Sequence, residues 1–216
     1  MRVLFVCSGN ICRSPLGAQV LTARLGPDAP AFVVESAGTI AQDGASMDDA
    51  AAAQSVRLGG SPDGHRARYL TAVIAGSADL VLTAERSHRA AVVSLAPRTA
   101  KRAFTVKQFA RVLDGLEPAE LAGVSTPEEL VALVARLRGT VPPLADPADD
   151  DVDDPYRRST ATHERVADEI AAALVVVADA LRAVDVHADP VRDTGLERGR
   201  CTRDGTPDPR GRPGAR

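Results

Sequence analysis

The sequence predicts an α/β protein in which a four-stranded parallel sheet lies between helices on both of its faces, in three layers. Short runs of β-branched residues alternate with longer amphipathic segments, a pattern typical of right-handed βαβ units. A loop with cysteine, glycine and arginine follows the first apolar run, Val3–Val6, and precedes a helical pattern. Ligands of such sheets bind beyond the carboxyl ends of the strands, so this loop is the expected functional site.

Each element is predicted from its own stretch of sequence, in chain order. Strands are expected where β-branched and other apolar residues cluster, at residues 2–6, 31–36, 79–83 and 102–106. Helices are expected where apolar residues recur at helical spacing, at residues 15–25, 47–57, 68–75, 86–94, 107–114, 127–138 and 160–184. Pro15 suits the first turn of the first helix and Ser14 is a good cap for it, whereas Gly17 costs that helix about 1 kcal/mol against alanine.

A single domain is expected over residues 1–185, because the chain has enough apolar material for one core. Within it, residues 115–150 are predicted to be a variable, loop-rich insert, since Pro and Asp are frequent from 139 to 154. Residues 186–216 are rich in Pro, Gly, Arg and Asp and have few large apolar side chains, so a disordered tail is expected there. Cys201 in this tail is expected to be an exposed thiol without a function.

Composition argues against several classes of partner. The net charge of −3 and the aromatic content of 3% provide neither a basic nor a stacking surface for nucleic acid. No apolar run reaches the length of a membrane span, and no room for a signal peptide precedes Cys7, so we expect a cytoplasmic protein with no membrane partner. Two cysteines in one loop fit a reducing compartment better than a secreted disulfide framework.

The segment Cys7–Pro15 carries the clearest chemical signal. The residues between Cys7 and Arg13 can bend the backbone into a cradle whose N–H groups converge on one point, and the following helix aims its positive end there. Such a cradle binds phosphate and favours the thiolate of Cys7, which is then nucleophilic at neutral pH. The expected phosphate-binding residues are Ser8, Gly9, Asn10, Ile11, Cys12, Arg13 and Ser14.

The same segment resembles the signature loop of the low-molecular-weight protein tyrosine phosphatases, which share their fold with thioredoxin-coupled arsenate reductases. Later segments resemble that family's further blocks in order, over about residues 1–183; they are residues 34–39, 65–68, 79–83 and 154–156. The resemblance implies an enzyme that hydrolyses phosphotyrosine in proteins, a phosphoric monoester, through a phosphocysteine intermediate. It implies a phosphorylated protein as substrate, a tyrosine kinase as a further partner, and no cofactor.

Besides the thiolate, this chemistry needs a cation and a proton donor. The planar fork of Arg13 can hold two phosphate oxygens at once. Asp154 stands in Asp154-Pro155-Tyr156, which resembles the family's acid-bearing loop, so Asp154 is the expected proton donor and Asp153 is the competing candidate. The surrounding acidic run lacks the glycine and the terminal glutamate of a calcium loop.

The resemblance also implies residues that support the loop. Ser14 would hydrogen-bond the thiolate, and Asn10, which tolerates unusual backbone angles, would be held by Ser36 and His65. His88 has no counterpart in these motifs, and no role is assigned to it.

Cys12 shares the expected cradle with Cys7. The resemblance implies a reversible disulfide between the two that protects the nucleophile from over-oxidation, and a small packed residue without a function is the alternative for Cys12. Two cysteines cannot close a tetrahedral zinc site, so no metal is expected.

The chain departs from the family pattern at the pocket wall, and alternative functions stay open. Gln42 stands where the family often has an aromatic residue, which leaves Tyr156 as the aromatic wall. A phosphoarginine phosphatase would typically carry a small hydroxyl residue in place of Ile11, and an arsenate reductase would need two more cysteines where only Cys201 is left. A phosphate-binding regulatory module without turnover would fit if Gln42 and the altered first helix, with Leu16-Gly17-Ala18 after Pro15, signal lost catalysis.

Overall fold

Four parallel strands form the sheet, in the order β2-β1-β3-β4. The computed structural model describes residues 1–26 and 31–185; the predicted tail and Cys201 lie outside the described residues. The strands are β1 (Arg2–Cys7), β2 (Val33–Gly38), β3 (Leu80–Thr83) and β4 (Ala103–Thr105). Because β1 pairs with β2 on one side and β3 on the other, the segment that leaves its carboxyl end starts from the middle of the sheet.

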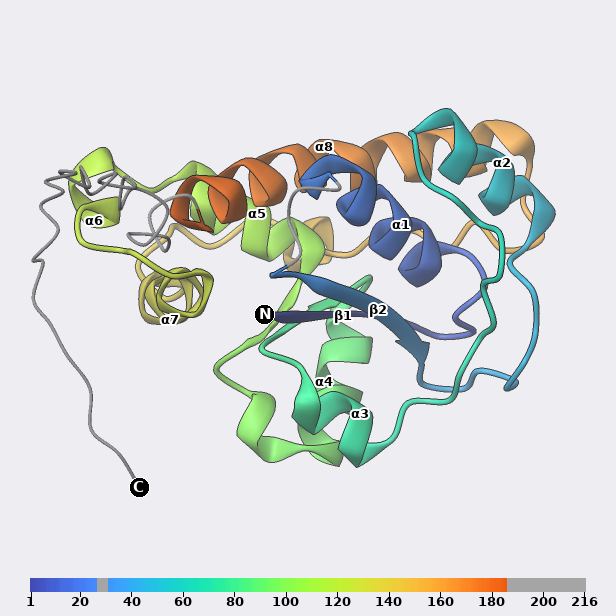
Figure 1. The fold of residues 1–216 in the computed structure, drawn as a ribbon, viewed down its shortest axis with the longest axis horizontal. Coiled ribbons are helices and arrows are strands. Elements are labelled where there is room, and N and C mark those ends of the chain that lie inside the picture. Colours follow the sequence, from blue (N-terminus) through green and yellow to red (C-terminus); the bar gives the residue numbers. More distant parts are fainter. Residues whose placement is uncertain (27–30, 186–216) are drawn as a thin grey trace, which may run out of the picture.

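Helices cover both faces of this sheet. They are α1 (Arg13–Leu25), α2 (Asp49–Arg57), α3 (Ala72–Ser77), α4 (Arg86–Leu95), α5 (Val106–Asp114), α6 (Pro118–Leu121), α7 (Pro127–Leu137) and α8 (Thr160–Asp185), with short 3-10 turns at η1 (Pro97–Thr99) and η2 (Pro147–Asp150). Figure 1 shows α1, α2, α5 and α8 over one face and α3 and α4 over the other. The predicted three-layer α/β fold is confirmed. Within the described residues, no helix combines the length and the apolar character that crossing a bilayer requires.

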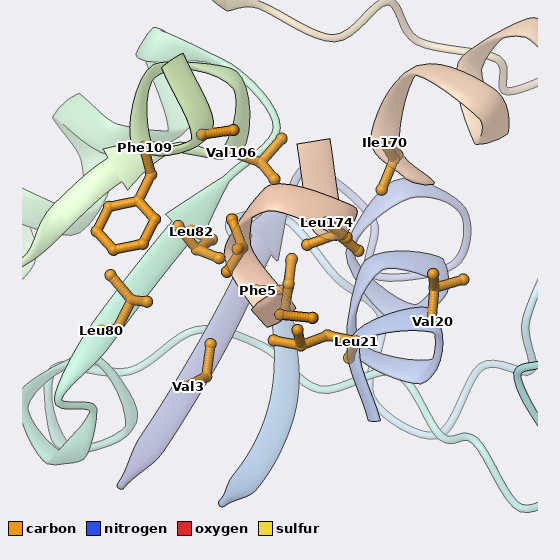
Figure 2. Packing of buried hydrophobic residues seen from close by; sticks show 14 of the residues in the cluster. Val3, Phe5, Val20, Leu21, Leu80, Leu82, Val106, Phe109, Ile170 and Leu174 are labelled. Carbon is orange, nitrogen blue, oxygen red and sulfur yellow. The ribbon is translucent and has the colours of Figure 1, made fainter. Parts of the chain in front are cut away.

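The side chains of β1 alternate between two hydrophobic cores. Val3 and Phe5 belong to the larger core under α1, α5 and α8, and Leu4 and Val6 belong to the smaller core against α3 and α4. Figure 2 shows Phe5 beside Leu21 of α1 within the larger core. Burial on both faces explains why the strand is a continuous apolar run without polar alternation.

Gly17 allows α1 to lie close to the sheet. A Cβ atom at Gly17 would stand 2.7 Å from Cδ1 of Phe5, a core residue that is only 4% exposed. That spacing is shorter than any ordinary carbon contact. The residue that weakens the helix by its propensity is therefore required by the packing of helix on strand.

One predicted helix boundary is wrong because tertiary hydrogen bonds take precedence. The helix expected at residues 68–75 begins only at Ala72. Before it, the chain runs beside the end of β2, where the N–H of Gly38 donates to Arg68 O at 3.0 Å and the N–H of Leu70 donates to Gly38 O at 2.8 Å. The Thr71 side chain then caps α3.

The segment 115–150 contains helices as well as loops. The sequence did not predict α6, whereas it did predict α7, whose Leu130 and Val134 are completely buried in the larger core. A reciprocal capping box between Thr126 and Glu129 starts α7. This part of the chain therefore contributes to the core on the face covered by α5 and α8.

Candidate active site

One residue with a left-handed backbone shapes the loop between β1 and α1. Asn10 has φ 54°, a conformation that asparagine adopts more readily than most residues. Its buried Nδ2 donates to Ser14 Oγ at 2.9 Å and to Ser36 Oγ at 2.8 Å. Its Oδ1 accepts from the N–H of Arg68 at 2.9 Å. A single side chain thus ties the loop to α1, to β2 and to the segment before α3.

His65 forms a hydrogen bond with the backbone of Asn10. Its Nε2 lies 2.8 Å from the carbonyl oxygen of Asn10. Burial lowers the pKa of His65 below its ordinary 6.5, so the ring is neutral at neutral pH and its Nε2–H donates to the carbonyl. The four residues expected to support the loop, Ser14, Asn10, Ser36 and His65, therefore meet in one hydrogen-bonded cluster.

Cys7 lies at the carboxyl end of β1 with 2% of its surface exposed. Its Sγ is 3.0 Å from Ser14 Oγ, and the carbonyl of Ala37 lies 3.3 Å from the same hydroxyl. Facing a thiolate, the Ser14 hydroxyl donates to the sulfur. The expectation that Ser14 caps α1 is wrong, because the helix begins at Arg13 and no side chain caps it. The hydroxyl lies inside the first turn and is used by Cys7 instead.

Three groups hold the guanidinium of Arg13, which is 3% exposed. Its Nη1 donates to the carboxylate of Glu85 and to the carbonyl of Val152, the latter at 2.8 Å, and its Nη2 lies 3.2 Å from Asp154 Oδ2. Burial acts to raise the pKa of Glu85, but the hydrogen bond and charge of Arg13 outweigh it, and the net shift is below the ordinary 4.5. Glu85 is therefore a carboxylate at neutral pH and orients the arginine.

Asp154 and Asp153 point to different places. Asp154 approaches Arg13 and lines the pocket above Cys7, while its Oδ1 accepts from the N–H of Tyr156 at 3.2 Å. The carboxylate of Asp153 pairs with Arg165 at 2.7 Å and is 70% exposed. Of the two candidates, the fold brings Asp154 to the arginine and the thiol.

Neighbouring acidic residues anchor the loop that carries Asp154. Asp150 is buried and pairs with Arg111 at 2.9 Å, and Asp151 binds the side chain of Arg86 at 2.9 Å and its backbone N–H at 2.7 Å. Burial acts to raise the pKa of Asp151, but the bonds from Arg86 outweigh it, so the net shift is downward. The N–H of Val152 completes the attachment by donating to a backbone carbonyl just before α4, at 2.8 Å.

A pocket of about 360 Å³ opens above the thiol. Its lining residues are Cys7, Ser8, Gly9, Ile11, Cys12, Arg13, Ile40, Gln42, Ala45, Asp154 and Tyr156. Gln42 and Tyr156, both predicted as wall residues, are among them. Ile40 was not predicted; it is 75% exposed at the pocket mouth, so its apolar side chain is available to a ligand. A larger groove, of about 560 Å³, lies between α1, β2 and residues 59–68 and includes neither the thiol nor Asp154.

Cys12 is the second thiol of this pocket. It is 4% exposed, and both it and Cys7 are free. Burial raises the pKa of Cys12 to about 12, and the negative charge of Asp48 adds to the effect. Cys12 is therefore a protonated thiol at neutral pH.

Glu85 and His88 both touch this site, although no sequence motif marked them. Glu85 is the second residue after β3, at the carboxyl edge of the sheet, and this position is the one signal that could have singled it out. His88 lies one turn further into α4, where its Nε2 is 2.8 Å from Ser8 Oγ. No local pattern in the sequence indicates that contact, because the two residues are 80 positions apart.

A central strand ends in a buried thiol, and the loop after it lines one pocket with that thiol, so the fold and the pocket define an α/β protein with a cysteine at the carboxyl edge of its sheet. The family model described as low molecular weight phosphotyrosine protein phosphatase matches residues 2–129, and the chain belongs to this family of hydrolases.

Individual relatives agree with this assignment. The low molecular weight protein-tyrosine-phosphatase Etp of Escherichia coli K12 is 38% identical over 107 residues, which cover 50% of this chain and 70% of Etp. A protein-arginine-phosphatase of Geobacillus stearothermophilus is 33% identical over 114 residues, which cover 53% of this chain and 74% of that protein. The crystal structure of a low molecular weight protein tyrosine phosphatase from T. tengcongensis matches with a TM-score of 0.62 and 28% identity, covering 84% of this chain and 99% of the other.

Proposed function

We propose that this chain hydrolyses phosphotyrosine in proteins through a phosphocysteine intermediate on Cys7. The observation that carries the proposal is that Cys7, Arg13 and Asp154 line one pocket. A thiolate, a cation for the phosphate oxygens and a carboxylic acid are the three groups that this chemistry requires. Membership of the phosphotyrosine phosphatase family supports the same conclusion.

In the first step, the thiolate of Cys7 attacks phosphorus while the bond from phosphorus to the tyrosyl oxygen breaks. Asp154 gives its proton to that oxygen, so tyrosine leaves as a neutral phenol. Arg13, oriented by Glu85, and the N–H groups of residues 8–14 stabilise the charge on the terminal oxygens. These donors are fixed before the substrate arrives and need no reorganisation during the reaction.

In the second step, water attacks the phosphorus of the phosphocysteine. The Asp154 carboxylate takes a proton from the water, and the electron pair of the S–P bond returns to the sulfur of Cys7. Ser14 Oγ, 3.0 Å from that sulfur, donates to the departing thiolate. Phosphate is released, and both Cys7 and Asp154 regain their starting protonation states.

The pocket wall favours an aromatic phosphoester over phosphoarginine. Ile11 and Ile40 contribute aliphatic surface to the pocket, and Tyr156 contributes aromatic surface. A planar apolar ring fits between such surfaces, whereas a guanidinium would lose hydrogen bonds to water against Ile11. The likeness to a protein-arginine-phosphatase makes phosphoarginine the second candidate.

The further parts of the proposal concern the surroundings of the enzyme. A phosphorylated protein is the substrate, and a tyrosine kinase that produces it is the natural partner. A reducing, cytoplasmic environment would keep Cys7 and Cys12 in the free state that they have here. Residues 1–185 are proposed to be the whole catalytic domain, so a chain truncated after Asp185 is expected to keep its activity.

The test compares phosphotyrosine, phosphoserine and phosphoarginine peptides as substrates of the purified protein and of Cys7→Ser. Wild type is expected to hydrolyse phosphotyrosine fastest and to show a phosphocysteine by mass spectrometry after rapid quenching. Cys7→Ser is expected to bind phosphate without turnover. Retention of activity in Cys7→Ser would contradict the mechanism, and faster release from phosphoarginine would contradict the proposed substrate.

A further inference from the structure

Ser8 and His88 form a hydrogen-bonded pair at the edge of the phosphate loop. Ser8 follows the nucleophile directly and lines the pocket. His88 lies in α4, and it is 5% exposed. Ser8 Oγ and His88 Nε2 are 2.8 Å apart. Ser8 is thus part of the pocket wall, His88 holds it without lining the pocket itself, and neither side chain has a role in the mechanism so far.

The second ring nitrogen indicates which atom of His88 carries the proton. His88 Nδ1 is buried and has no hydrogen-bond partner among the described residues. A buried N–H without an acceptor is rarer in proteins than a buried acceptor without a donor, so the bare nitrogen is Nδ1 and the proton is on Nε2. Nε2–H then donates to Ser8 Oγ, which leaves the Ser8 hydroxyl proton free to point elsewhere.

The charges around His88 are consistent with a neutral ring. Burial lowers the pKa of His88 below its ordinary 6.5, against the influence of Glu85 and with that of Arg13. The negative charges of Asp154 and Asp151, on the loop after η2, act to raise this pKa, but the net shift remains downward. The pair therefore contributes a dipole, without a net charge, to a pocket whose cation is Arg13.

We propose that the Ser8 hydroxyl, oriented by His88, donates a hydrogen bond to a terminal oxygen of the bound phosphoryl group. The inference rests on the proposed function, since it assigns a ligand atom to the same pocket. Ser8 acts on the substrate directly, and His88 is a positioning residue that acts through Ser8. The hydroxyl adds one side-chain donor to the backbone N–H groups and to the fork of Arg13.

The chemical consequence differs from that of a proton donor. A terminal oxygen carries charge while the phosphocysteine forms and while it is hydrolysed, so the Ser8 hydroxyl stabilises both steps. No bond to Ser8 forms or breaks, and no proton leaves it. Its effect should therefore be the same for good and poor leaving groups and should extend to inorganic phosphate and vanadate, which occupy the cradle without a leaving group.

The experiment is a double-mutant cycle with Ser8→Ala, His88→Phe and the two combined. The readouts are kcat/KM for a phosphotyrosine peptide and the dissociation constants of vanadate and inorganic phosphate. Ser8→Ala is expected to lose about tenfold in each, the usual effect of one hydrogen bond to a charged group. His88→Phe keeps the ring bulk and is expected to lose several-fold, while the double variant should lose no more than Ser8→Ala alone.

Two matched variants complete the design. Ser8→Thr keeps the hydroxyl and is expected to stay close to wild type in phosphate binding. Ser77→Ala removes an exposed hydroxyl that bonds only within α3, and it is expected to change nothing. Phosphate binding is measured by calorimetry without turnover, so it tests Ser8 even if the peptide proves to be no substrate.

Three results would overturn the inference. The first is phosphate and vanadate binding by Ser8→Ala at the wild-type level. The second is full additivity of the two single variants, which would mean that His88 does not act through Ser8. The third is a loss that appears only in the unfolding midpoint, since a purely structural pair would lower thermal stability and leave ligand affinity per folded molecule unchanged.

Discussion

Replacing Asp154 with asparagine removes an acidic proton and little else. The amide side chain of the Asp154→Asn variant keeps an oxygen that can accept from the N–H of Tyr156, so the local turn is preserved. The variant also loses the contact with Arg13, but the Asp154 carboxylate is 52% exposed and such a pair contributes about 0–1 kcal/mol. Because a tenfold change in rate corresponds to about 1.36 kcal/mol, the lost pair accounts for less than tenfold.

The loss of rate that we expect for Asp154→Asn is much larger than the lost ion pair with Arg13 could cause. A general acid typically contributes about 10²- to 10⁴-fold, and most when the leaving group is a poor one. We therefore expect Asp154→Asn to slow phosphotyrosine peptides and alkyl phosphates by at least about a hundredfold, and phosphates of acidic phenols far less. The assay is a series of aryl phosphates of graded phenol acidity, with the first step followed in single turnovers.

Asp153→Asn is the matched control, one residue away. Within the described residues Asp153 forms one ion pair, with Arg165 on the surface, so its variant should stay within about twofold of wild type with every substrate. A large, leaving-group-dependent loss in Asp153→Asn, together with normal behaviour of Asp154→Asn, would refute the assignment of the acid.

Three further outcomes follow from the packing of Gly17, from the two thiols and from the lowered pKa of His88. Gly17→Ala gains about 1 kcal/mol of helix propensity but drives a methyl group into Phe5, and overpacking costs about 1–3 kcal/mol, so chemical denaturation should show a net loss of stability. Peroxide should inactivate the wild-type protein reversibly and the Cys12→Ser variant irreversibly. Because burial raises the pKa of Cys12 to about 12, a higher pH increases its thiolate fraction, so the disulfide between Cys7 and Cys12, followed by mass spectrometry, should form faster as the pH rises. Burial lowers the pKa of His88 in the folded protein below 6.5, so the unfolded chain binds a proton at His88 more readily than the folded chain does. The neutral His88 ring therefore contributes fully to the free energy of unfolding above pH 6.5. This contribution is lost as the pH falls through the pKa of His88 in the folded protein. Urea titrations of His88→Gln between pH 7.5 and pH 5, about the range in which histidine changes charge, should show a smaller acid loss than wild type, and an equal loss would rule out this linkage.

The parts of the site that sequence could predict are those whose geometry is local. Cys7, Arg13 and Ser14 follow one another across a single strand, loop and helix, so their convergence is encoded within one short segment. Glu85 and His88 reach the loop only because β3 pairs with β1, and they lie 72 and 80 residues from their partners Arg13 and Ser8. The order of the strands in the sheet determines contacts of that kind, and the spacing of residues in the sequence does not reveal that order.

The misplaced start of α3 and the exposed Ile40 have the same origin. The segment 68–71 has a helix-compatible sequence, but the N–H of Arg68 is needed by Asn10 and its carbonyl by Gly38. Ile40 was not predicted from the sequence; its N–H donates to the carbonyl of Ser8 at 3.0 Å, and its exposed side chain lines the pocket. In both cases a tertiary contact decides the local structure, and for α3 it overrides a local preference.

The distribution of the site along the chain sets the order in which it can be assembled during synthesis. Cys7 precedes the partners that complete its surroundings: β1 pairs with β3 only once Leu80–Thr83 has been made, and Arg13 obtains a carbonyl partner only with Val152. Asp154, the proposed proton donor, follows, and α8, which packs against α1, comes after it. A growing chain therefore carries Cys7 long before the pocket around it is complete, and we expect the proposed activity only after α8 has been translated.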